Sequence, residues 1–204
     1  MSNRAIVVAM TGASGAQYAL RLLEVLIAAG EEVHFVISEP GRMVVNTETD
    51  LRLPSRPSEI RAVLTARFEG LGTLHVFGLQ DWMAPMASGS NAPRAVVVVP
   101  CTSGTLAAIA AGTCRSLIDR AADVALKERR QLILVPREMP FSAIHLENML
   151  KLARLGAVIM PPAPGFYQHP TRIEDLIDFV VARILDHLEI DQSLLPRWGA
   201  DRVE

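Results

Sequence analysis

Residues 4–15, RAIVVAMTGASG, contain a continuous run of apolar and β-branched residues followed by a loop of small residues. A run of this kind predicts a strand that is buried on both faces, as in a parallel sheet. Apolar residues then recur at helical spacing over 16–29, and Gly30 stands where a helix C-cap glycine belongs. The segment therefore predicts a strand, a tight loop and a helix, which is the first half of a βαβ unit.

The same alternation continues along the chain. Further strands are predicted at 33–38, 73–77, 95–100, 131–136 and 157–160. Helices are predicted near 58–67, after 101, and at 117–129, 142–155 and 173–189, whereas 84–94 is predicted to be a loop. Strands that alternate with helices imply βαβ units. We therefore expect one α/β domain over 1–189, with a three-layer α/β/α Rossmann-like (flavodoxin-like) parallel sheet, and a tail at 190–204 that packs on a neighbouring subunit.

The composition disfavours several classes of protein. The chain of 204 residues has 20 Lys and Arg against 22 Asp and Glu, and its net charge of −2 disfavours a broad nucleic-acid binder. Pro100 and small polar residues interrupt the most apolar stretch, 95–114, so no membrane span is predicted. There is no CxxC motif and no signal-peptide pattern. We expect a reduced, soluble, cytoplasmic protein, whose 50% hydrophobic content predicts surface buried between subunits.

The expected fold also predicts where a ligand binds. In open α/β sheets, ligands lie outside the carboxyl ends of the strands. Five segments follow predicted strand ends, and we expect the chemistry there: 11–15, 38–48, 84–91, 101–104 and 137–138.

Two of these segments are small-residue loops that open a helix. TGASG at 11–15 and CTSG at 101–104 allow close backbone approach, and the N–H groups of a helix N-terminus favour a phosphate. Neither contains the GxGxxG spacing of a dinucleotide site or the GK[ST] of a nucleotide-hydrolysing loop. The alternative is a tight turn in which Ser14 only caps the helix. Cys101 is a candidate nucleophile, although free cysteines are more often buried.

Further candidates are charged or polar residues near strand ends and on helices. The loop 88–91, SGSN, suits a phosphate nest or a plain surface turn. Arg120 and Lys127 are seven residues apart on a predicted helix and share a face, as an anion clamp or as part of a solvated surface. Glu138 is a candidate general acid or base, with an ion pair to Arg137 as the alternative.

Tyr167 follows the last predicted strand, where its hydroxyl can donate to a phosphate or its ring can pack under the loop. The five histidines show no metal-ligand spacing such as HxxxH, so no metal site is predicted.

Together these segments resemble the UbiX-type flavin prenyltransferases, which were historically described as aromatic-acid or polyprenyl-hydroxybenzoate decarboxylases. The resemblance covers nearly the whole chain. It rests on TGASGAQYALRLL (11–23), ETD (48–50), DWMAPMASGS (81–90), VVVVPCTSGTLAAIA (96–110), LIDRAADVALKERRQLILVPRE (117–138), HLENMLKLARLGAVIMPPAPGFY (145–167), DFVVARILDHL (178–188) and LLPRWG (194–199).

The resemblance implies two binding sites and a set of catalytic residues. FMN would be bound by Gly12, Ala13, Ser14, Ser38, Cys101, Thr102, Ser103, Gly104 and Arg137. The phosphate of dimethylallyl monophosphate would be bound by Ser90, Arg120, Lys127, Tyr167 and Arg183, some of them from neighbouring subunits. Catalysis would involve Ser14, Glu48 and Glu138.

The implied reaction transfers the dimethylallyl group to N5 and then C6 of reduced FMN. The product would serve a UbiD-type decarboxylase, and the family implies a dodecamer. No DDxxD motif is present to hold Mg²⁺, so cationic side chains and proton transfer would replace a metal ion.

Three other functions fit these residues less well. Related flavoproteins decarboxylate cysteine, but they use a catalytic histidine and a PxMNxxMW-type clamp that this chain lacks. Direct decarboxylation of an aromatic acid has no evident mechanism with FMN alone. A non-catalytic FMN-binding regulatory subunit would not need the second anion site.

Overall fold

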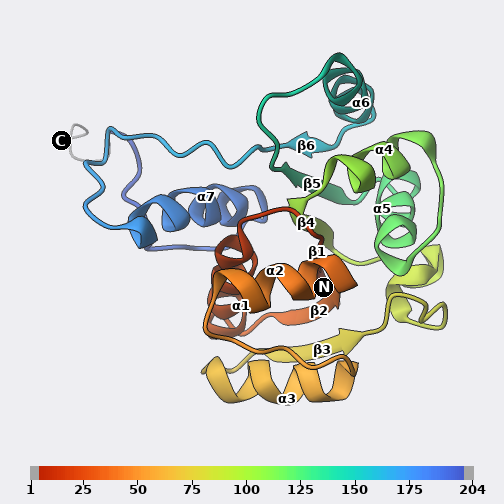
Figure 1. The fold of residues 1–204 in the computed structure, drawn as a ribbon, viewed down its shortest axis with the longest axis horizontal. Coiled ribbons are helices and arrows are strands. Elements are labelled where there is room, and N and C mark those ends of the chain that lie inside the picture. The colour runs from red at the N-terminus through yellow and green to blue at the C-terminus, as the bar shows by residue number, and fades with distance from the viewer. Residues whose placement is uncertain (1–4, 200–204) are drawn as a thin grey trace.

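The computed structural model describes residues 5–199, and they form an α/β fold around one parallel sheet (Figure 1). The six strands lie in the order β3-β2-β1-β4-β5-β6, the order of the Rossmann fold. Their bounds are β1 Ile6–Met10, β2 Glu32–Ile37, β3 Thr73–Phe77, β4 Ala95–Cys101, β5 Gln131–Pro136 and β6 Val158–Ile159. Every neighbouring pair is parallel. The predicted fold class is confirmed.

Helices cover both faces of the sheet and form the two outer layers. Alternate residues along β1 and β4 belong to two separate apolar clusters, one on each face. Residues of α1 (Ala16–Ala28), α2 (Glu39–Glu48), α3 (Pro57–Arg67) and α7 (Ile173–His187) complete the first cluster. The second is completed from α4 (Ser103–Ala111), α5 (Leu117–Lys127) and α6 (Ala143–Arg154). Burial on both faces explains why the strands are continuous apolar runs without polar alternation.

One helix was not predicted. The segment 38–48 was expected to be a ligand-binding loop, but Glu39–Glu48 form α2. Ser38 caps this helix by accepting a hydrogen bond from the Gly41 N–H at 3.0 Å, and Pro40 lies in the first turn. Ser followed by Pro at a helix start is the signal that would have predicted it.

The other departures are small. The loop 84–94 contains two short 3₁₀ turns, Pro85–Ala87 and Gly89–Asn91. Of the predicted tail, Ile190 is buried against the first apolar cluster and Leu194 packs on it. Residues 200–204 of that tail, and Arg4 of the first predicted strand, lie outside the described residues. No helix in the described part of the chain is long and apolar enough to cross a membrane.

The order of the strands changes direction between β1 and β4, and this switch point brings two loops together. Strands β2 and β3 lie on one side of this pair, and β5 and β6 on the other. The buried hydroxyl of Thr11 donates to the Pro100 carbonyl and accepts from the Thr102 N–H, each at 2.8 Å. Thr11 therefore joins the loop after β1 to the loop after β4, where a doubly wound sheet binds its ligand.

Replacing Thr11 with Val tests this connection. The change keeps the shape but leaves the partly buried Thr102 N–H without its acceptor. We therefore expect a loss of about 1–2 kcal/mol in the free energy of unfolding, measured in urea. Thr47→Val is the matched control, because the Thr47 hydroxyl is exposed on α2 and bonds only the Met43 carbonyl. The control should lose less than about 0.5 kcal/mol. Equal losses in the two variants would show that Thr11 has no special role.

Candidate functional site

The loop after β1 is closed by a carboxylate from the end of α2. Gly15 begins α1 with a φ of 112°, a backbone conformation that side chains disfavour. One oxygen of Glu48, Oε2, accepts hydrogen bonds from the N–H groups of Gly15 at 2.9 Å and Ala16 at 3.0 Å. The first loop therefore already contains an anion at the helix N-terminus, which was expected to hold a phosphate.

This arrangement sets the charge of Glu48. Burial alone would raise its pKa, but the Ser14 hydroxyl, the Gly15 and Ala16 N–H groups and the Arg137 charge together hold the pKa below its ordinary value. Glu48 is therefore ionised at neutral pH, where it accepts hydrogen bonds and is a candidate base. Its contact with Ser14 brings together two of the three residues expected to be catalytic.

The loop after β4 leads into a helix start whose backbone N–H donors are available to a ligand. Thr102 caps α4 by accepting from the Thr105 N–H. In the described part of the chain, the first-turn N–H groups of Ser103 and Gly104 have no acceptor. A Cβ added at Gly104 would have no atom within 4 Å, so the space beside this turn is open. These free donors make the start of α4, rather than that of α1, the better place for an anion.

The surroundings of Cys101 disfavour a role as nucleophile. Its side chain is fully buried, and burial together with the charge of Asp119 raises the pKa of the thiol to about 12. A thiolate is the reactive form, and it is negligible at neutral pH. The Cys101 carbonyl instead accepts from the Arg137 N–H at 3.3 Å, which places Arg137 beside the fourth-strand loop.

Arg137 and Glu138 lie at the end of β5, next to the two loops. No ion pair joins them, so the alternative weighed for this pair is wrong in the described structure. The Nε atom of Arg137 is buried and has no acceptor. The half-buried Glu138 accepts only from the Met139 N–H, at 3.3 Å. A buried guanidinium nitrogen without a partner is the kind of atom that a ligand oxygen satisfies.

Three of the five residues expected to bind phosphate lie around α5. The Arg120 Nε donates to the Ala87 carbonyl at 2.9 Å, and its Nη1 donates to Asp123 at 2.7 Å. Lys127 pairs with its neighbour Glu128 and borders Gly89, next to Ser90. Both cations therefore share the helix face that meets the 87–90 loop, as their spacing predicted.

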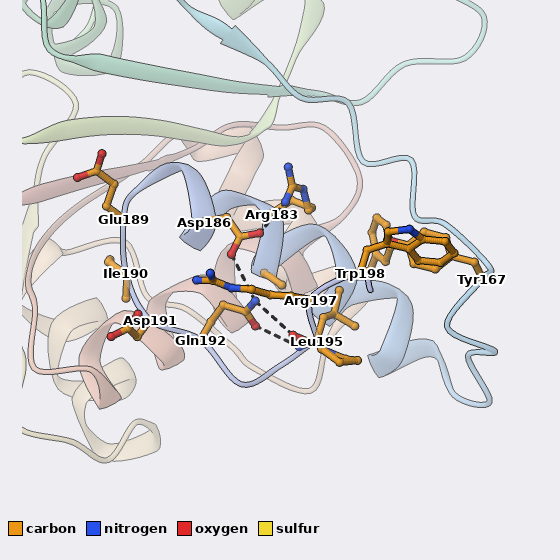
Figure 2. A pocket seen from close by; sticks show the side chains of 13 residues that line it. Tyr167, Arg183, Asp186, Glu189, Ile190, Asp191, Gln192, Leu195, Arg197 and Trp198 are labelled. Carbon is orange, nitrogen blue, oxygen red and sulfur yellow. Dashed lines mark hydrogen bonds and ion pairs between the residues drawn. The ribbon is translucent and has the colours of Figure 1, made fainter. Parts of the chain in front are cut away.

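The other two, Tyr167 and Arg183, line a cavity of about 670 Å³ near the C-terminal end of α7 (Figure 2). The Tyr167 ring stands edge-on between Phe179, at 5.7 Å between centroids, and Trp198, at 5.1 Å. Arg183 donates to Asp186 at 2.6 Å. The two interpretations of Tyr167 are both compatible with this geometry, because the ring packs while the residue borders the cavity.

The expected phosphate residues around α5 do not meet those near α7 within one chain. The helix α5 and the 84–91 loop lie on one side of the molecule, and α7 with the C-terminal segment lies on the other (Figure 1). The flavin-loop residues gather around the switch point, but the five expected phosphate residues divide into two sets. No group of three or more potential metal ligands occurs among residues 5–199.

Sequence reasoning missed the residues that support Arg183 and Tyr167. Asp186 and Phe179 lie in a predicted helix, and Gln192 and Trp198 lie in the predicted tail, and no chemistry was assigned to any of the four. The only local signal was an acidic residue three positions after Arg183, which is the spacing of a helical ion pair. The capping of α1 by Glu48 spans 33 residues and has no local signal.

Comparisons with known proteins agree with this geometry. The family model described as Flavoprotein matches residues 1–185. The flavin prenyltransferase UbiX of Pseudomonas aeruginosa is 62% identical over 97% of this chain and 95% of its own length. A crystal structure of AnUbiX with FMN and dimethylallyl pyrophosphate has a TM-score of 0.84 and 45% identity, and covers 96% of this chain and 97% of that one.

A third similar structure is a dodecameric FMN-dependent UbiX-like decarboxylase from Escherichia coli O157:H7. Its TM-score is 0.82 with 39% identity, and the match covers 95% of this chain and 98% of that one.

The residues present fit an FMN group. The unpaired Nε of Arg137, the free N–H groups at the start of α4 and the open space at Gly104 all border the switch point. The small residues 12–14 complete this border on the β1 side. A phosphate and a polar ring system would satisfy these donors.

The charge of Glu48 gives a pH-dependent prediction. Because its pKa in the folded chain lies below the ordinary 4.5, its ionised form stabilises the fold above that pH, and the contribution disappears as the pH falls through the folded value. We expect Glu48→Gln to lose about 1 kcal/mol of unfolding free energy at pH 7, the size of a helix cap, and to lose progressively less in acid. Urea unfolding of the flavin-free protein between pH 3 and pH 7 measures this, because the ordinary glutamate pKa lies between these two limits. The exposed Glu147, changed to Gln, is the control, and a pH-independent loss in Glu48→Gln would contradict the assignment.

Proposed function

Since the chain belongs to the UbiX-type flavin prenyltransferases of the Flavoprotein family, we propose that it transfers a dimethylallyl group from dimethylallyl monophosphate to reduced FMN. The observation that carries the proposal is the 62% identity to a flavin prenyltransferase over 97% of the chain. The chain also contains the two binding regions that such a reaction needs. Small residues and free N–H donors at the switch point suit the flavin, and separate cationic side chains suit a phosphate.

The flavin would lie at the carboxyl ends of β1 and β4. Ser103 and Gly104 would donate to it through their N–H groups, and Arg137 through its buried Nε. Gly12, Ala13 and Ser14 would approach it from the first loop, with Ser38, Cys101 and Thr102 holding the loops in place. Reduced FMN supplies the nucleophilic N5 and C6 positions of the reaction.

The chain's own cations would take the place of a metal ion. Arg120 and Lys127, with Ser90, present one set of donors, and Arg183 with Tyr167 presents the other. Monophosphate is a poor leaving group, so the charge that develops on it must be offset where it leaves. Guanidinium and ammonium groups that hold the phosphate oxygens provide this offset without Mg²⁺.

Two carboxylates, Glu48 and Glu138, would accept and donate protons in the reaction. Glu48, held ionised, accepts a hydrogen bond from the Ser14 hydroxyl and can draw a proton through it. Glu138 stands at the end of β5 on the other side of the switch point and is the second proton-transfer group. Glu48 and Glu138 thus flank the place where the flavin would lie.

The division of the phosphate residues supports an active site between subunits. Since α5, which contains Arg120 and Lys127, lies across the molecule from α7, which contains Arg183 (Figure 1), copies of the chain would have to supply the two sets to one site. We propose a homo-oligomer, a dodecamer like the similar E. coli protein, in which the 190–204 tail packs on a neighbour. The enzyme would act in the cytoplasm and deliver its product to a UbiD-type decarboxylase.

The decisive experiment is anaerobic incubation of the protein with reduced FMN and dimethylallyl monophosphate, followed by mass spectrometry of the bound flavin. We expect the flavin to gain one C5H8 unit and inorganic phosphate to appear in equal amount. Activity should survive EDTA, because cations of the chain replace a metal. A parallel reaction with dimethylallyl pyrophosphate identifies the preferred donor. An unchanged flavin with both donors would refute the proposal.

Removing a cation from either set should separate flavin binding from turnover. We expect Lys127→Ala and Arg183→Ala to retain FMN, measured by absorbance, and to lose about 10²–10³ in single-turnover rate, since each offsets charge on the departing phosphate. Arg129→Ala removes a neighbouring exposed cation outside the site and should turn over normally.

Co-expression of the two defective variants then tests the shared site. If neighbours combine their sets, oligomers mixed from Lys127→Ala and Arg183→Ala chains contain some sites with both cations, and activity partly returns. Mixed oligomers as inactive as either parent would place both sets in one chain's site and contradict the arrangement.

A further inference from the structure

Asp186 lies at an electrostatically unfavourable place on α7. It is the penultimate residue of the helix, where the partial negative charge of the C-terminus disfavours an acidic side chain. The stability of α7 therefore does not explain why an acidic residue stands at position 186. Its Oδ2 accepts from Nη1 of Arg183 at 2.6 Å, one turn earlier, at the edge of the cavity that also contains Tyr167 (Figure 2).

The second oxygen of Asp186 is also engaged. The Gln192 side chain donates to Oδ1 at 3.3 Å, and Gln192 is itself fixed because its Oε1 accepts from the Leu195 N–H at 3.1 Å. The dashed lines in Figure 2 trace this chain of contacts from Arg183 to the segment after α7. An ordinary surface ion pair of two mobile side chains contributes little. This one is anchored on a folded segment.

The geometry leaves one edge of the Arg183 guanidinium free. Asp186 binds only Nη1, and among residues 5–199 no acceptor binds Nε or Nη2. Nε and Nη2 form the side of the guanidinium that binds two oxygens of one anion in parallel. The Asp186 carboxylate therefore contacts only Nη1 of the guanidinium and leaves the edge formed by Nε and Nη2 for a ligand.

We propose that Asp186, anchored by Gln192, is the positioning residue of Arg183 and sets the guanidinium to bind two oxygens of the substrate phosphate. The inference rests on the proposed function, because it deepens the role of Arg183 there. Holding the side chain in place before the substrate arrives reduces the rotamer entropy that binding would cost. The effect belongs to phosphate binding and leaves the flavin site unchanged.

The test compares Asp186→Asn with Asp191→Asn. Asp191 lines the same cavity but makes no hydrogen bond or ion pair in the described part of the chain, so its variant removes the same charge without the contact. Single-turnover rates are measured against the concentration of dimethylallyl monophosphate. We expect Asp186→Asn to raise the half-saturating concentration about tenfold, the size of one charge-assisted hydrogen bond, with FMN content and maximal rate little changed. Asp191→Asn should match the parent, and Gln192→Ala should shift the concentration in the same direction as Asp186→Asn.

A double-variant cycle separates positioning from a merely structural role. If Asp186 acts through Arg183, adding Asp186→Asn to Arg183→Ala changes nothing further, whereas independent effects would multiply. Tighter substrate binding in Asp186→Asn would show that the carboxylate competes with the phosphate, and equal behaviour of Asp186→Asn and Asp191→Asn would show that it does nothing. Either result overturns the inference while a defective Arg183→Ala still supports the proposed function. A normal Arg183→Ala would instead refute the phosphate role of Arg183 itself.

Discussion

The capping of α1 by the Glu48 carboxylate is the contact on which the arrangement of the site depends. It joins the end of α2 to the start of α1 and fixes the first loop between them. Without an acceptor, the Gly15 and Ala16 N–H groups would be unpaired at a helix N-terminus that bears a partial positive charge. The carboxylate satisfies both donors, and in return the helix and Arg137 keep it ionised. One contact thus determines a loop conformation and the protonation state of a candidate base.

This contact also decides where other anions can bind. A helix N-terminus whose donors already hold a carboxylate offers little to a phosphate, so the start of α4 and the side-chain cations remain. Thr11 keeps these regions in register, because its hydroxyl joins the loop after β1 to the loop after β4. The two small-residue loops, which look alike in the sequence, therefore differ in the structure: the first binds an internal carboxylate, and the second has free N–H donors among the described residues.

The strength of a local signal determined what the sequence could predict. The strands were predictable because burial on both faces requires continuous apolar runs, and Arg120 and Lys127 could be placed on one face by helical spacing alone. The helix α2 was missed because only Gly41 and Val45 of it are buried, so its sequence contains no long apolar stripe, although Ser38 and Pro40 mark its start. The role of Glu48 depends on partners 32 and 33 residues away along the chain, and no local spacing encodes it. The i, i+3 spacing of Arg183 and Asp186 marks a helical ion pair but does not reveal the contact with Gln192.

Each cation proposed to hold phosphate has an acidic partner on its own helix or next to it. Arg120 pairs with Asp123, Lys127 with Glu128 and Arg183 with Asp186. Gathering unpaired positive charges at a subunit interface would repel the subunits before any substrate bound. The paired acids reduce that repulsion and are consistent with a chain whose net charge is only −2. Since each pair is at least partly exposed, it is weak enough for a dianionic phosphate to share the cation. In the proposed function, local neutralisation would let several like charges gather at one site without a metal ion and would still leave those charges available to the substrate.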